Sequence, residues 1–355
     1  MRSSIIALPP NRVRRNYRGG ALLDLFVEKR PACDGIQPED WIASTVRASN
    51  PGLPPVVDEG LAFVMDESKG RISLGELFAS DPEFYLGRKH FADFGLQVGF
   101  LAKMLDSAMR LHVQAHPTAA FAQQHLSSRW GKLETYVILK VRDGCDPFIR
   151  LGFQRPPSKN EWRRIILEQD IAAMDACFDP IPVRVGEVWL VPGGLPHAIG
   201  PGVLMLEVME PTDLVVRCEF EREGIIVPPE ARFMGRDLDF CLQIFDYTKR
   251  SPAEIRADYC IKPQGISQNE TRLIGPAQTS SFSISRYKAG GVMVLPAAPT
   301  LRVCIVADGK GFLEVAGERL PLHPGCRFLL PAAATEGKIT PLEGETVDLL
   351  VCAPG

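Results

Sequence analysis

The sequence predicts a mainly β protein, in which two β-sandwich or jelly-roll domains carry helical insertions. Glycine and proline are both plentiful, at 31 and 30 of 355 residues, and are spread along the chain. This composition favours many short strands joined by tight turns over a helical bundle. Short alternating stretches, from Val183 to Phe220 and from Phe282 to the end, are typical of strands with one buried face. A chain of this length can bury two cores, so we expect two domains.

The order of these stretches divides the chain into three parts. We expect a first domain over residues 1–235, a helical connection over 236–265 and a smaller, more purely β domain over 266–355. Helices are predicted near 73–109, 158–178 and 237–247. The second is the clearest, because a Pro-Pro-Ser start precedes apolar residues at nearly helical spacing from Trp162 to Phe178.

Composition and charge exclude several classes of partner. The net charge is −3 and the isoelectric point about 6.1, so the chain lacks the basic surface of a protein that binds nucleic acid or an anionic membrane. No apolar run approaches the length that spans a bilayer. The nine cysteines include no Cys-x-x-Cys pair, and several lie in apolar runs. We expect most of them to be buried thiols in a reducing compartment, which makes the cytoplasm the predicted location.

The most informative segment runs from Gly186 to His197. Its spacing, Gly-(x)5-Pro-x-Gly-(x)2-His, is similar to the second metal-binding motif of the cupin superfamily. Gly186 allows a turn into a strand, and the Pro192-Gly193-Gly194 bend at the strand's end would direct His197 into a barrel interior. A single histidine after such a turn can also be an ordinary loop residue, so this interpretation depends on further ligands.

Three further polar residues can join His197 at one site. Gln114 and His116 are separated by one residue, so on a strand they point to the same face. Glu134 opens the next predicted strand. The four side chains offer two imidazoles, a carboxylate and an amide, a ligand set that Zn²⁺ accepts with room left for substrate or water. We therefore predict a metal site at Gln114, His116, Glu134 and His197.

Several spaced segments together resemble the type I mannose-6-phosphate isomerases. They are Leu111-His-Val-Gln-Ala-His-Pro117, Gly131-Lys-Leu-Glu134, the turn from Pro192 to Gly202, and Glu207 followed by Thr212-Asp213-Leu-Val-Val-Arg217. Weaker likenesses, including Gly19-Gly20 and Glu39-Asp-Trp-Ile-Ala-Ser44, extend the resemblance over most of the chain. The segments follow one another in the family's order, which distinguishes this resemblance from a match to a single motif.

The resemblance implies one zinc ion per chain at the four predicted ligands, with Lys132, Glu207, Asp213 and Arg217 as catalytic residues around it. It also implies a reaction, proton transfer between C1 and C2 of a sugar through a cis-enediol, which interconverts mannose 6-phosphate and fructose 6-phosphate. This reaction needs a positioned base and a cation near the developing enediolate. Arg217 and the metal suit the second need, whereas Lys132, Glu207 and Asp213 all remain candidates for the base. An alternative role for Asp213 and Arg217 is a structural ion pair.

Two positions depart from the family pattern near the expected phosphate. His112 stands where the family usually has serine, and Thr118-Ala119-Ala120 replaces a more charged segment. Lys103, Arg110 and Arg217 remain as candidate phosphate partners, and a protonated His112 could assist them. We expect Lys103, His112 and Arg217 to contact the substrate, which is a sugar phosphate or, alternatively, an unphosphorylated or otherwise altered sugar.

The C-terminal third repeats the cupin motif in degraded form. Gly325 to Pro331 keeps the Gly-(x)5-Pro spacing, but Glu336 stands in the place of the histidine. A lone carboxylate is a poor metal site, so this domain is expected to be structural and free of metal.

Two other functions stay open beside the isomerase. Cupins include iron-dependent oxygenases, whose usual ligand sets are three histidines or two histidines and a carboxylate. Gln114 and the Asp213 and Arg217 pair favour the isomerase over this class. The second alternative is a non-catalytic sugar-binding or regulatory protein. In every case we expect a small-molecule partner, no nucleic acid and no membrane, in a monomer or weak homodimer.

Overall fold

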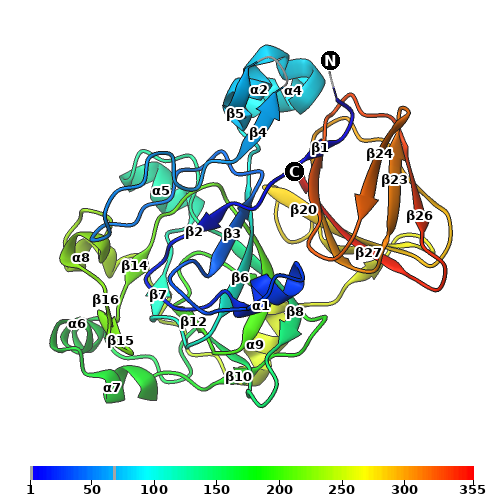
Figure 1. Cartoon of the computed structure of the whole chain (residues 1–355). Helices are drawn as coiled ribbons and strands as arrows, with labels where there is room; N and C mark the ends of the chain where they lie inside the picture. Colours follow the sequence, from blue (N-terminus) through cyan, green and yellow to red (C-terminus); the bar gives the residue numbers. More distant parts are fainter. Residues whose placement is uncertain (1–2, 67–68) are drawn as a thin grey trace.

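The computed structural model describes residues 3–66 and 69–355, and it is mainly β with short helices, as the sequence predicts. Figure 1 shows two bodies side by side. The strands near the C-terminus, coloured orange to red, curl into one sandwich, and most of the remaining chain forms a larger body beside it. Their sheets are built from antiparallel strand pairs, which is typical of sandwich folds.

Two sheets build the larger body. One has the strand order β17-β11-β8-β13-β6-β3-β2 and the other the order β10-β9-β12-β7-β14. The strands of the first are β17 (Cys260–Ile261), β11 (Val188–Val191), β8 (Glu134–Val141), β13 (Val203–Met209), β6 (Leu101–Ser107), β3 (Glu39–Ile42) and β2 (Arg12–Val13). Those of the second are β10 (Ile181–Pro182), β9 (Phe148–Leu151), β12 (His197–Ile199), β7 (Gln114–Ala115) and β14 (Val216–Arg217).

The C-terminal body is also a pair of sheets, with the orders β1-β25-β22-β27-β20-β19-β18 and β21-β26-β23-β24. The strands of the first are β1 (Ile6–Ala7), β25 (Arg327–Leu330), β22 (Arg302–Asp308), β27 (Val347–Pro354), β20 (Phe282–Ala289), β19 (Glu270–Ile274) and β18 (Gln264–Gly265). Those of the second are β21 (Met293–Leu295), β26 (Gly337–Pro341), β23 (Gly311–Val315) and β24 (Glu318–Leu322).

The two bodies pack sheet against sheet through an apolar interface. Leu204 and Leu206 of β13 lie in one buried cluster with Val303 and Leu350 of the C-terminal sheet. Successive side chains of a strand point to opposite faces, so Glu207 points away from this interface, into the larger body. The C-terminal sandwich therefore supports the back of the sheet that carries Glu207.

The helix predicted over 73–109 is correct only in its first part. Three short helices occupy it, α2 (Leu74–Ser80), α3 (Pro82–Leu86) and α4 (Arg88–Phe94), but strand β6 follows where the helix was expected to continue. All seven residues of β6 are buried, so the strand shows no alternation of apolar and polar residues. A short run buried on both faces cannot be distinguished from a helix by periodicity.

The other predicted helices are present in altered form. The one near 158–178 is confirmed as two helices, α6 (Lys159–Glu168) and α7 (Ile171–Ala176), while the one near 237–247 is reduced to α8 (Leu238–Cys241). Helices that were not predicted individually are α1 (Ala21–Phe26), α5 (Ala119–His125) and α9 (Pro252–Tyr259). The remaining elements are the hairpin strands β4 (Phe63–Asp66), β5 (Gly70–Ser73), β15 (Glu221–Arg222) and β16 (Ile225–Ile226), and the 3₁₀ turn η1 (Pro229–Ala231).

The N-terminal segment links the two bodies. It pairs with β25 through β1, crosses to pair with β3 through β2, and then runs beneath the candidate site. A buried ion pair joins the same two bodies, because Arg327 Nη1 lies 2.6 Å from Asp40 Oδ2. The domain boundaries at residues 235 and 265 stay a prediction. Within the described ranges, no helix is long and apolar enough to cross a membrane.

Candidate active site

Three of the predicted metal ligands converge in the larger body. Ligand atoms of His116, Glu134 and His197 lie within 4.8 Å of one another, and all three residues are buried. The fourth predicted ligand, Gln114, is adjacent, with its Nε2 atom 3.3 Å from His197 Nε2. The grouping follows from the strands, since His197 of β12 pairs directly with Gln114 of β7 and Glu134 begins β8 on the facing sheet.

The surrounding hydrogen bonds orient these side chains for a cation. His116 Nδ1 lies 2.8 Å from the Leu214 carbonyl oxygen, and His197 Nδ1 lies 3.0 Å from the Leu195 carbonyl oxygen. A carbonyl can only accept, so each Nδ1 carries the proton and each Nε2 keeps a lone pair directed at the cluster. Tyr136 donates its hydroxyl to Glu134 Oε2 at 2.6 Å and fixes the carboxylate.

Electrostatics also suit a divalent cation here. Burial, with the neighbouring Lys132 ammonium, lowers the pKa of His116 to about 3, and burial likewise lowers the pKa of His197. Both imidazoles are therefore neutral near pH 7, the form that binds metal. Burial acts to raise the pKa of Glu134, but Lys132 and the two imidazoles hold it well below its usual range. Two neutral imidazoles, an ionised carboxylate and a side-chain amide fit a metal such as Zn²⁺.

Two glycines let the ligand-bearing turns approach each other. A Cβ atom on Gly131 would lie 2.4 Å from the Pro117 carbonyl oxygen, and one on Gly193 would lie 2.6 Å from the same atom. The backbone N–H of Gly194 donates to the His116 carbonyl at 2.7 Å, and that of Lys132 donates to Pro117 at 3.1 Å. The Pro117 turn is thus held between the segments that present Glu134 and His197.

Lys132 lies inside the metal cluster. Its Nζ atom is 2.9 Å from Glu134 Oε1 and 3.4 Å from His116 Nε2, and only 4% of its side chain is exposed. It is therefore positioned beside the predicted metal ligands, as the resemblance implies for a catalytic residue.

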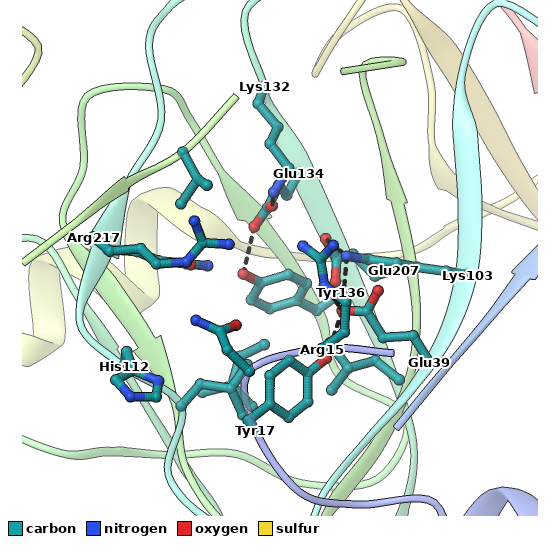
Figure 2. Close-up of a pocket in the computed structure, with 16 residues that line it drawn as sticks. Arg15, Tyr17, Glu39, Lys103, His112, Lys132, Glu134, Tyr136, Glu207 and Arg217 are labelled. Carbon is teal, nitrogen blue, oxygen red and sulfur yellow. Dashed lines mark hydrogen bonds and ion pairs between the residues drawn. The ribbon is translucent and has the colours of Figure 1, made fainter. Parts of the chain in front are cut away.

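A second group of buried charges lines the pocket on β13, β6 and β3, which follow β8 in the sheet that carries Glu134 (Figure 2). Lys103 Nζ lies 3.2 Å from Glu207 Oε1 and 3.3 Å from Glu39 Oε1, so both carboxylates share its charge. Burial and the neighbouring Glu134 carboxylate raise the pKa of Glu207 to about 8, while the Lys103 and Lys132 ammoniums oppose the shift. Lys103 was predicted to contact substrate, and here it is held by two acids.

The N-terminal segment adds pocket residues that sequence reasoning missed. Arg15, Tyr17 and Glu39 line the pocket, and Figure 2 shows all three near Lys103 and Glu207. Tyr17 donates its hydroxyl to Glu39 at 2.5 Å, and Arg15 Nε lies 3.5 Å from the same carboxylate. A signal was available, because Glu39 lies in a segment that resembles the family, but no metal motif surrounds it.

Asp213 and Arg217 do not form the ion pair that was one alternative for them. Asp213 accepts two hydrogen bonds from Arg15, at 3.0 and 3.1 Å. Burial acts to raise the pKa of Asp213, but this guanidinium holds it well below its usual range. Arg217 lines the pocket and donates through Nη1 to the Ala231 carbonyl at 2.6 Å. Burial, together with the Arg15 guanidinium, lowers the pKa of Arg217 to about 10, so it remains charged near pH 7.

The two other residues that the sequence suggested for phosphate binding have different settings. His112 lines the pocket beside Arg217, but burial lowers its pKa to about 4, so the expected protonated form is absent near pH 7. Arg110 is turned away and makes a two-fold contact with Glu219, at 2.9 and 3.0 Å. Among the described residues, Arg217 is therefore the candidate that lines the pocket as a cation without a carboxylate contact of its own.

The chain is similar in sequence to curated mannose-6-phosphate isomerases. No family model matches the chain. A curated mannose-6-phosphate isomerase of Streptococcus mutans is 29% identical over 274 residues, which covers 77% of this chain and 79% of that protein. A Bacillus subtilis protein described as a putative mannose-6-phosphate isomerase is 24% identical over 333 residues, 94% of each chain.

Solved structures show the same fold over the whole chain. The crystal structure of a mannose 6-phosphate isomerase from Bacillus subtilis superposes with a TM-score of 0.73 at 20% identity and covers 99% of both chains. A putative mannosephosphate isomerase from Archaeoglobus fulgidus gives a TM-score of 0.72 at 17% identity, with 99% of this chain covered. In sequence the chain is similar to curated mannose-6-phosphate isomerases, and it has the fold of the solved structures of such enzymes.

Proposed function

We propose that the chain is a metal-dependent aldose–ketose isomerase, for which mannose 6-phosphate and fructose 6-phosphate are the first pair to test. One observation carries the proposal. Glu134, a member of the buried group of His116, Glu134 and His197, lines the same pocket as Glu207, a carboxyl with a raised pKa. A cation site beside a base of tuned pKa is what proton transfer next to a carbonyl requires. The relatives' names support the same reaction.

The proposed cofactor is one Zn²⁺ per chain, held by Gln114, His116, Glu134 and His197. When bound, the ion would polarise the sugar's oxygens and stabilise negative charge that develops on them. The nitrogen and oxygen donors favour zinc over metals that prefer all-oxygen sites. The rival oxygenase would need iron at the same ligands, so metal analysis of the purified protein separates the two.

Glu207 is the proposed base that moves the proton between C1 and C2. A pKa of about 8 lies close to working pH, where a general base is most effective. Asp213 is less suitable, because its carboxylate is engaged by Arg15 and its pKa is lowered. Lys132 contacts Glu134 and His116, which suits it to orient a sugar hydroxyl near the metal ligands.

Arg217 is proposed to stabilise the enediolate as its charge develops. It is the pocket guanidinium that donates to a backbone carbonyl, whereas Arg15 is paired with Asp213. A fixed cation in a water-poor cavity costs little reorganisation when the charge appears. Arg217, Glu134 and Glu207 line this pocket and are all buried, so little of their surface contacts bulk water.

The proposed location is the cytoplasm. All nine cysteines are free thiols, and burial raises the pKa of most of those that lie in the core, which keeps them unreactive. A protein with this pattern suits a reducing compartment.

A coupled isomerisation assay with metal analysis of the same sample tests the proposal. Mannose 6-phosphate and free mannose would be supplied side by side to the purified protein. Turnover of either sugar by a zinc-containing sample supports an isomerase. Bound iron with oxygen uptake would support the oxygenase, and sugar binding without turnover would support a non-catalytic protein.

A further inference from the structure

Two arginines of the catalytic pocket have partners of different kinds. Arg15 and Arg217 both line the pocket, and both are buried (Figure 2). Arg15 donates to the two carboxylate oxygens of Asp213, at 3.0 and 3.1 Å, whereas Arg217 donates to the carbonyl oxygen of Ala231 at 2.6 Å. In the part of the chain that the structure describes, Arg217 has no carboxylate contact. The pocket therefore contains one guanidinium whose charge is neutralised and one whose charge is not.

Asp213 lies near enough to Arg217 to act on it. The two residues are four positions apart in the sequence and line one cavity together with Leu214 and Val215. Burial and the Arg15 guanidinium lower the pKa of Arg217, and Asp213 opposes this shift more than any other acid. Asp213 is therefore the acid that would pair with Arg217 if it were released from Arg15.

The donors around Asp213 explain why it does not pair with Arg217 in the folded protein. Besides the two hydrogen bonds from Arg15, its carboxylate accepts the backbone N–H of Ser49 at 3.1 Å. Without Arg15, this N–H would be the one donor left to it among the described residues. A buried carboxylate needs a cation close by, and a guanidinium, with its forked donors, is the strongest partner for it. Loss of Arg15 would thus draw Arg217 towards Asp213.

Arg15 is held in place by contacts that do not involve Asp213. Its backbone N–H donates to the carbonyl oxygen of Ile36 at 2.8 Å, and its Nε atom lies 3.5 Å from Glu39 Oε1. Its guanidinium lies over the ring of Trp41, 5.8 Å from the centroid. Glu39 and Trp41 belong to β3, whereas Arg217 belongs to β14 of the other sheet. Arg15 is therefore presented to Asp213 by a separate part of the fold.

We propose that Arg15 is a positioning residue, which holds Asp213 and thereby keeps the Arg217 guanidinium free for the negative charge that develops on the substrate. The inference rests on the isomerase function proposed above, in which Arg217 stabilises the enediolate. A guanidinium that is paired with a carboxylate has little net charge to offer to a second anion, so the enediolate would be stabilised less. Arg15 acts through Asp213 and Arg217, not on the reacting atoms.

Removing Arg15 in two backgrounds tests the proposal. In the wild-type background, Arg15→Met should lower kcat roughly tenfold or more for the sugar phosphate that is turned over, because Asp213 then neutralises Arg217. When Asp213→Asn is already present, no carboxylate competes for Arg217, and adding Arg15→Met should lower kcat by less than about threefold. An equal loss in both backgrounds overturns the proposal, because Arg15 would then act independently of Asp213.

Two further variants separate the charge of Arg15 from its effect on the chain around it. Arg15→Lys keeps a cation beside Asp213, so kcat should stay within about threefold of the wild-type value. The matched control is Arg14→Met, which removes the neighbouring ion pair with Glu59, at 2.9 Å, but changes no described residue that lines the pocket. It should leave kcat within about twofold of the wild-type value. A loss in either variant as large as that in Arg15→Met contradicts the proposal.

A crystal structure of Arg15→Met gives a readout that does not depend on turnover. We expect the Arg217 guanidinium to leave the Ala231 carbonyl and to contact Asp213 at about 2.8 Å, the length of a charge-assisted hydrogen bond. If Asp213 and Arg217 stay apart, the proposal is wrong even where kcat falls. If Arg15→Met does not fold, Arg15→Gln, which keeps a hydrogen-bond donor but no charge, replaces it in both experiments. The crystal structure decides the question even if the wild-type protein isomerises no sugar, the result by which the proposed function itself would fail.

Discussion

Two carboxyl groups in the catalytic pocket have pKa values shifted in opposite directions. Glu134 is held ionised by Lys132 and two imidazoles, while burial and the Glu134 charge raise the pKa of Glu207. Divergent environments of this kind commonly separate a group that stays charged from one that transfers protons. The opposite shifts support the proposed roles, in which Glu134 binds the metal and Glu207 transfers the proton.

Replacing the proposed base tests this assignment. Glu207→Gln keeps the shape of the side chain but removes its proton-accepting carboxylate, so kcat should fall by roughly 10²- to 10⁴-fold. Zinc content should stay at the wild-type level, because Glu207 is not a member of the buried ligand group of His116, Glu134 and His197. Rate assays and metal analysis on one preparation check both points. A variant that retains wild-type kcat would move the role of base to another residue.

Because of the ion pair between Asp213 and Arg15, we expect the free energy of unfolding to depend on pH in the acidic range. Asp213→Asn removes the carboxylate that contacts the buried Arg15 guanidinium at two points and leaves Glu39, 3.5 Å from Arg15 Nε, as its acidic partner. Losing this buried pair should cost about 3 kcal/mol of unfolding free energy at neutral pH. The pKa of Asp213 is lower in the folded protein than in the unfolded chain, where it is about 3.9. The stabilisation by the ion pair is therefore complete above about pH 3.9 and is lost as the pH falls towards the pKa of the folded protein. Urea unfolding at several pH values should therefore show the two proteins converging below about pH 4. A constant difference down to pH 2 would contradict the assigned ion pair.

Some site residues could be predicted from the sequence, and others could not. Gln114, His116, Glu134 and His197 come together as predicted, because strand alternation and the turn at Gly194 fix their directions locally. Arg15 could not be found in this way, since it reaches the pocket through the path of the N-terminal segment. That path depends on strand pairings β1–β25 and β2–β3, which are distant in the sequence.

At the scale of elements, the site depends on the close approach of three turns. Gly131 and Gly193 both lie next to the Pro117 carbonyl oxygen. A Cβ atom on either glycine would come too close to this oxygen. Gly131→Ala should therefore displace the start of β8, and with it Glu134, and weaken zinc binding roughly 10- to 100-fold, as for other changes to the support of metal ligands.

The matched control for this change is Gly291→Ala. A Cβ atom on Gly291 meets nothing within 4 Å, so zinc affinity should stay at the wild-type value. Competition against a chelating dye would measure both variants. Equal affinities would show that the turn contact does not position Glu134.

Elements were predicted best where one face is exposed. Strand β23 alternates between buried and half-buried residues along its length, and helix α6 follows a capping serine, so the sequence indicates both elements. The error falls on β6, which is buried on both faces and was predicted as part of a helix. There, tertiary packing decides the structure, and periodicity carries little of that information.

At the scale of the whole molecule, the C-terminal sandwich is part of the catalytic body's support. Its sheet packs against the back of the sheet that holds Glu207, and the N-terminal segment joins both bodies. We therefore expect the two bodies to unfold together. Leu350→Ala, at the fully buried interface, should lower the unfolding free energy by about 2–5 kcal/mol within a single transition.

The control for this prediction is Val292→Ala, because Val292 is 64% exposed on the far side of the same body and should change stability little. Urea unfolding followed by both fluorescence and circular dichroism would test cooperativity. Two separate transitions in the wild-type protein would show instead that the sandwiches are independent.

The central claim, a metal-dependent isomerase centred on His116, Glu134 and His197, is tested most directly by removing and restoring the metal. Free mannose and mannose 6-phosphate would be assayed with purified protein, with chelated protein, and after addition of increasing Zn²⁺. We predict that activity on the preferred sugar disappears on chelation and returns in full at one Zn²⁺ per chain, while His197→Ala neither binds zinc nor recovers. Activity that survives chelation, or persists in His197→Ala, would contradict the account.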